Sequence, residues 1–100
     1  MTAERRAHHR LVLTTPAEVI VGGEPYPAAL VSLSLGGAAL RVDVECQTGQ
    51  LVEVRLRLPQ SGWIGVRAEV VRVAARALGV RFLALDPVSL GALAALLGRT

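Results

Sequence analysis

The segment from Leu51 to Leu58 places the strongest constraint on the fold. Val52, Val54, Leu56 and Leu58 alternate there with Glu53, Arg55 and Arg57. A period of two residues puts the apolar side chains on one face of an extended chain and the charged ones on the other. The segment is therefore predicted to be a half-buried β-strand, whose apolar face must be covered by other strands.

Similar patterns recur along the chain between segments typical of turns. They predict further strands over residues 11–21, 25–34, 38–42, 63–73 and 76–85, with turns at 22–24, 36–37, 45–50, 59–62 and 74–75. The alternation slips at Val70 and Val71, which predicts a β-bulge. Consecutive strands joined by short turns favour antiparallel pairing, and closure removes exposed edges. We expect a mostly all-β fold, a six-stranded antiparallel β-barrel.

One helix is predicted after the last strand. Asp86 and Pro87 have the properties of an N-cap and a first helical residue, and the helix should run from about Pro87 to Leu97 and end at Gly98. Leu90, Leu93 and Leu97 share one stripe, predicted to pack on the barrel. The helix carries no charge, so a second apolar face is also predicted to form a homodimer.

Length and charge limit the classes of function. A chain of 100 residues suits one domain, and its apolar stretches are shorter than the roughly 20 residues of a membrane span. A cytoplasmic protein with no membrane partner is expected. The chain has eleven arginines and eight acidic residues, and this positive excess favours the binding of a small anion. The positive charges are too scattered along the chain to predict DNA binding. The arginines of the strands are interpreted as solvated faces: Arg41, Arg55, Arg57, Arg67, Arg72, Arg76 and Arg81.

Residues 1–10 are predicted to form a flexible basic arm before the domain at 11–98. Arg6 and Arg10, with Arg5 beside them, offer planar guanidinium groups that can bind phosphate, a guanine edge or a base face. The turn Ser32-Leu33-Ser34-Leu35-Gly36-Gly37 adds small side chains that let a flat base approach the backbone. Arm and turn together indicate a clamp for an anion and a guanine.

The arm Arg6-x-x-x-Arg10, the turn Ser32-x-Ser34-x-x-Gly37 and the segment Leu78–Phe82 occur in an order that resembles a PilZ domain over nearly the whole chain. The resemblance implies that cyclic di-GMP binds outside a six-stranded barrel. Arg6 and Arg10 would hold guanine and phosphate, Arg5 would lie nearby, and Ser34 and Gly37 would match the motif. It also implies a receptor that signals to an unidentified effector protein when the arm becomes ordered.

One position departs from the family pattern. Ser32 stands where the family has Asp or Asn, and it lacks a carboxylate or amide carbonyl to accept a hydrogen bond from guanine. An unpaired ligand group costs about 1–3 kcal/mol, or roughly tenfold to a hundredfold in affinity. The alternative function is therefore a PilZ-like interaction module that does not bind nucleotide.

Structural interpretations of the two motifs also stay open. Arg6 and Arg10 would then be a solvated tail, and the glycines after Ser34 would provide a turn with positive φ. An enzyme is not expected, because His8 and His9 have no acid or nucleophile spaced to act with them. Neither a cofactor nor a metal is expected, and the single Cys46 is interpreted as a small filler.

Overall fold

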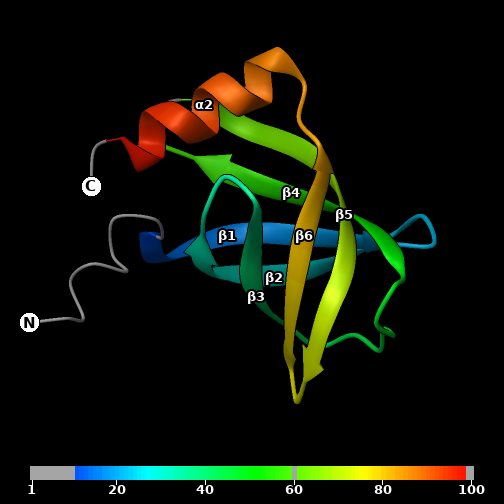
Figure 1. Ribbon diagram of the computed structural model, residues 1–100. Helices are drawn as coiled ribbons and strands as arrows, with labels where there is room; N and C mark the ends of the chain where they lie inside the picture. Colours follow the sequence, from blue (N-terminus) through cyan, green and yellow to red (C-terminus); the bar gives the residue numbers. More distant parts are fainter. Residues whose placement is uncertain (1–10, 60, 99–100) are drawn as a thin grey trace, which may run out of the picture.

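A computed structural model describes residues 11–59 and 61–98 of the protein, and within these ranges the side chains from Thr15 onward. It contains six strands: β1 (Leu11–Val21), β2 (Glu24–Leu33), β3 (Gly37–Val42), β4 (Leu51–Leu58), β5 (Gly62–Ala74) and β6 (Ala77–Ala84). They pair in the order β1-β2-β3-β6-β5-β4 and close into a barrel. Every pairing is antiparallel, which confirms the predicted barrel (Figure 1).

Backbone conformations with positive φ occur in several of the connections between strands, and two of these are hairpin turns. Gly22 and Gly23, between β1 and β2, have φ values of 59° and 85°, which suit a tight hairpin because they follow the twist of the strands. Arg76 has φ 58° and lies in the turn between β5 and β6. The prediction that Arg76 begins the last strand was wrong, because its left-handed backbone does not continue a ladder.

The register shows one expected irregularity and three that were not expected. β5 shifts its register against β6 between Val70 and Arg72, which confirms the predicted bulge. β2 shifts between Leu30 and Ser32 against β3, and β1 shifts between Val12 and Thr15 against β2. β5 also shifts between Arg67 and Ala68 against β6. Each shift changes which residues of a strand face outward.

The core fills the inside of the barrel with aliphatic side chains. Val54 and Leu56 of β4 are fully buried, as their alternation predicts, and Leu30, Leu33 and Leu40 of β2 and β3 are also fully buried. The strands contribute further side chains to the same cluster: Ala17, Val19, Val42, Val52, Leu58, Ile64, Val66, Ala68, Val70, Leu78, Val80 and Phe82. With the inside filled, a ligand site has to lie on the outer wall.

The helix α2 (Pro87–Leu97) lies across one end of the barrel (Figure 1). Asp86 caps it as predicted, because its Oδ1 accepts a hydrogen bond of 2.7 Å from the backbone N–H of Ser89. Leu93 is fully buried, whereas Leu90 is 43% exposed. The predicted stripe was therefore wrong at Leu90, since the helix turns a different face inward. That face is formed by Ser89, Ala92, Leu93, Leu96 and Leu97.

No helix in the described part of the chain has the length and apolar character needed to cross a membrane.

Candidate functional site

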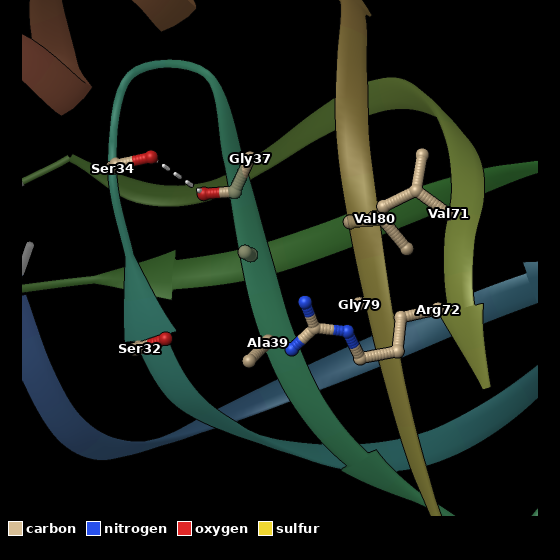
Figure 2. Close-up of a pocket in the computed structure, with 9 residues that line it drawn as sticks. Ser32, Ser34, Gly37, Ala39, Val71, Arg72, Gly79 and Val80 are labelled. Carbon is tan, nitrogen blue, oxygen red and sulfur yellow. Dashed lines mark hydrogen bonds between the residues drawn. The ribbon is translucent and has the colours of Figure 1, made fainter. Parts of the chain in front are cut away.

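A pocket of about 390 Å³ opens on the outer wall of the barrel (Figure 2). Most of its lining residues are small, and they come from β2, β3, β5, β6 and the turn after β2: Ser32, Ser34, Gly37, Ala38, Ala39, Val71, Arg72, Gly79 and Val80. The three residues that the sequence predicted for the turn, Ser32, Ser34 and Gly37, are thus brought together in one pocket.

The turn at one end of the pocket is fixed by hydrogen bonds. The backbone N–H of Ser34 donates to the carbonyl of Gly37 at 2.9 Å. The hydroxyl of Ser34 accepts from the N–H of Gly36 at 3.3 Å and lies 3.4 Å from the carbonyl of Gly37, to which it donates (Figure 2). Gly36 in turn accepts a bond of 2.8 Å from the N–H of Phe82. The turn is therefore fastened to β6 and presents a preorganised edge.

Gly37 is required by a close backbone approach. A Cβ atom at this position would lie 2.2 Å from the carbonyl oxygen of Val80, so any side chain would push β3 away from β6. Neither Gly36 nor Gly37 has a positive φ. The interpretation that these glycines serve a left-handed turn was wrong, because the constraint at Gly37 is contact between strands.

Ser32 faces the pocket because of the bulge in β2. Leu30 is inward, and without the register shift Ser32 would be inward as well. With the shift, Ser32 pairs with the outward Ala39, and Leu33 pairs with Ala38 on the inner side. Ser32 lines the pocket but is only 6% exposed, so little of its surface is accessible to solvent.

Arg72 is the charged residue of the pocket lining, and the sequence did not identify it as a site residue. It lies on β5 directly after the bulge, and its side chain extends across Gly79 of β6 toward Ala39 of β3 (Figure 2). Its interpretation as part of a solvated strand face gave no reason to single it out. The predicted slip at Val70 and Val71 was the available signal, because a bulge changes the side to which the next side chain points.

The arm residues Arg5, Arg6 and Arg10 lie outside the described residues. The described chain begins at Leu11, which pairs with Leu33, and Val12 pairs with Ser32. The backbone of β1 therefore enters the barrel beside the pocket.

A second pocket, of about 540 Å³, lies beside Cys46 at the link from β3 to β4. Cys46 is a free, partly buried thiol, and this burial raises its pKa above the ordinary value. A raised pKa keeps the thiol protonated at neutral pH, which is unfavourable for a nucleophile. Among residues 11–59 and 61–98, no group of three His, Cys, Asp or Glu side chains is arranged to hold a metal ion.

The comparison with protein families is decisive, since residues 4–99 match the family model described as the PilZ domain. The chain belongs to the PilZ domain family. The match covers both the arm and the barrel, and the order of motifs in this PilZ domain agrees with it. No curated protein matches the chain significantly.

Solved structures resemble this PilZ domain in fold. The crystal structure of the PilZ domain of CeSA from a cellulose-synthesizing bacterium has a TM-score of 0.74 and 19% identity, covering 91% of this chain and 96% of that chain. The PilZ domain with c-di-GMP of YcgR from Escherichia coli has a TM-score of 0.75 and 18% identity, with coverage of 90% and 86%.

A third structure is the Bacillus subtilis inhibitor of motility MotI/DgrA, with a TM-score of 0.80 and 19% identity. The alignment covers 91% of this PilZ domain and 48% of that protein, so the domain corresponds to about half of it.

Proposed function

We propose that this PilZ domain is a receptor for cyclic di-GMP and that the nucleotide binds in the pocket on the outer wall. The observation that carries this proposal is that Ser32, Ser34 and Gly37 line one pocket beside the start of β1. The alanine and glycine residues of the lining have small side chains or none, which lets the face of a guanine approach the backbone. The arm that carries Arg6 and Arg10 joins the barrel next to it.

The arm supplies the positive charge in this proposal. Cyclic di-GMP carries two phosphates and two guanines, and guanidinium groups can bind both. Arg6 and Arg10 hold a guanine and a phosphate, and Arg5 contributes at the rim. An arm that closes over the ligand loses conformational freedom and changes the surface beside β1. An effector protein that contacts this surface then responds to the concentration of the messenger.

The output is a change of protein contact, so the domain acts as a receptor and adaptor rather than as an enzyme. The structure of the PilZ domain of YcgR with c-di-GMP supports the choice of ligand. Family membership supports the choice as well.

Isothermal titration calorimetry with cyclic di-GMP tests the proposal, with GTP and cyclic di-AMP as controls. We expect binding to the wild-type protein and a loss of at least a hundredfold in affinity for Arg6→Ala or Arg10→Ala, because each variant removes a charge-assisted contact. Binding that is absent from the wild-type protein, or unchanged in both variants, would contradict the proposal.

The second candidate function is an interaction module that binds no nucleotide. Ser32 favours it, because its short side chain lacks the carboxylate or amide carbonyl that the family's Asp or Asn offers to guanine. The apolar helix would then provide the contact with a partner protein, since Val88 is 79% exposed and Leu90 is 43% exposed.

A homodimer through α2 stays a prediction, and it is compatible with either function. Light scattering at high protein concentration, with and without cyclic di-GMP, measures the oligomeric state, and a monomer under both conditions would contradict the homodimer.

A further inference from the structure

Four residues form a row across the outer wall, which we call the transverse row. Ser32 of β2 pairs with Ala39 of β3, Ala39 pairs with Gly79 of β6, and Gly79 pairs with Arg72 of β5. Residues directly opposite each other in neighbouring strands share a face of the sheet. The transverse row therefore joins the predicted turn to Arg72 across three strand-to-strand steps, a distance of about 14 Å.

The bulge in β5 explains why Arg72 belongs to this row. Val66, Ala68 and Val70 are buried at every second position, and an unbroken strand would direct residue 72 inward as well. The register shift after Val70 adds one residue, Val71, and leaves Arg72 exposed on the outer wall. Without the bulge, an arginine would enter an aliphatic core, so the bulge and the arginine are structurally linked.

The middle of the transverse row leaves room for the side chain of Arg72. A Cβ atom at Gly79 would lie 3.2 Å from the Cβ of Arg72, closer than ordinary packing allows without adjustment. Ala39 adds only a methyl group. Arg72 can therefore extend along the wall toward Ser32, and its guanidinium group lies over the floor of the pocket (Figure 2).

The charge of Arg72 is not neutralised within the described structure. No Asp or Glu lines the pocket, and among residues 11–59 and 61–98 no carboxylate forms an ion pair with Arg72. Arg55 and Arg81, by contrast, form ion pairs with glutamates. An unpaired guanidinium group in a pocket without acids attracts an anion, and its planar geometry matches the oxygens of a phosphate.

We propose that Arg72 binds a phosphate of the nucleotide from the β5 side of the pocket. The proposal rests on the proposed function and deepens it. The ligand then meets the turn residues Ser32 and Ser34 at one end of the pocket and the guanidinium group of Arg72 on β5 at the other. Arg72 acts as a ligand-binding residue that lies outside the two motifs.

Calorimetric titration of cyclic di-GMP into Arg72→Ala and Arg72→Lys tests this proposal, with Arg57→Ala as the matched control. Arg57 is an exposed strand arginine outside the pocket, and its loss changes the net charge by the same amount. We expect about tenfold weaker binding for Arg72→Ala, a smaller loss for Arg72→Lys, and no more than about a twofold change for Arg57→Ala.

Equal affinities for Arg72→Ala and Arg57→Ala, with the wild-type protein binding, would overturn the role of Arg72 and leave the proposed function intact. No binding by the wild-type protein would overturn the proposed function, and the role of Arg72 with it. The guanidinium resonance of Arg72 in NMR spectra gives a second measurement. A shift on titration supports direct contact, and an unchanged resonance at saturation contradicts it.

Discussion

Two arginines on the outer wall, Arg72 and Arg55, occupy similar strand positions and have different surroundings. Arg55 of β4 lies between two glutamates: its Nε is 3.3 Å from Oε2 of Glu53, and its Nη1 is 3.8 Å from Oε1 of Glu18. Arg72 has Gly79 as its partner across the strands, with Ala39 beyond it. Arg55 is neutralised by its neighbours, whereas Arg72 has no acidic partner among the residues that the structure describes.

Glutamates on the same strand and on the neighbouring strand decide the difference. Glu18 is the direct partner of Arg55 in the β1–β4 pairing, so their charges face each other in the folded chain. Exposed pairs of this kind contribute little to stability, but they occupy the guanidinium group. The general lesson is that the role of an exposed strand arginine follows from the residues beside it on the same face of the sheet, both along its strand and across to the next, rather than from its own exposure.

The largest expected effect is on stability, and it distinguishes Gly37, which lines the pocket, from Gly65, which lies beside Arg55. Gly37→Ala should destabilise the fold by about 3 kcal/mol, because its Cβ would meet the carbonyl oxygen of Val80 at 2.2 Å and backbone atoms have little freedom to move. Gly65→Ala, beside Arg55, places its Cβ 2.8 Å from Oε2 of Glu53, the flexible end of a side chain. It should cost less than about 1 kcal/mol. Chemical denaturation of both variants measures the difference.

Gly36→Ala is the control for Gly37→Ala. It changes the neighbouring residue of the same turn, and apart from its two neighbours in the chain no residue comes within 4 Å of its added Cβ. Its stability should stay within about 0.5 kcal/mol of the wild-type protein. Similar stability losses for the variants at 36 and 37 would contradict the role assigned to the contact between β3 and β6.

The sequence predicted more of the barrel than of the pocket, for a physical reason. Alternation with a period of two identifies a strand such as Leu51–Leu58 from local residues alone, and Asp86 and Pro87 mark a helix start in the same way. The partner of a strand residue depends on register, and bulges shift it by one position. The pairing of Arg72 with Gly79 therefore could not be read from the sequence, although the bulge itself was predicted.

The motif residues of the turn were a different case. Ser32, Ser34 and Gly37 were predicted through their spacing, and they do line one pocket. The reason for Gly37 could not be predicted, because the carbonyl of Val80 belongs to a strand more than forty residues later. The roles of Arg5, Arg6 and Arg10 stay predictions, since these residues lie outside the described part of the chain.

A second prediction concerns a substitution that introduces an acidic residue beside Arg72, comparable to the glutamates beside Arg55. Ala39→Glu places a carboxylate in the transverse row, where it can pair with Arg72 and repel the phosphates of the ligand. The affinity for cyclic di-GMP should fall by about tenfold to a hundredfold relative to Ala39→Gln. The glutamine variant has nearly the same size without the charge. Equal calorimetric affinities for the two variants would show that charge in the pocket is not important for binding.

The smallest expected effect concerns the other end of the transverse row. Ser32→Asn adds an acceptor at the position where the family pattern has Asp or Asn, and it should raise the affinity for cyclic di-GMP by about tenfold. Ser32→Asp adds the same acceptor with a charge. Because Ser32 is only 6% exposed and shares the row with Arg72, the carboxylate loses hydration and competes for the guanidinium group. We expect a smaller gain for Asp than for Asn.

Calorimetry on the two Ser32 variants separates the explanations. A gain for Asn that exceeds the gain for Asp supports both the missing acceptor and an Arg72 that is available to an anion. Equal gains indicate that the acceptor alone matters and that Arg72 does not sense charge at position 32. If neither variant nor the wild-type protein binds, the missing acceptor does not explain the absence, and the interaction module becomes the better interpretation of this PilZ domain.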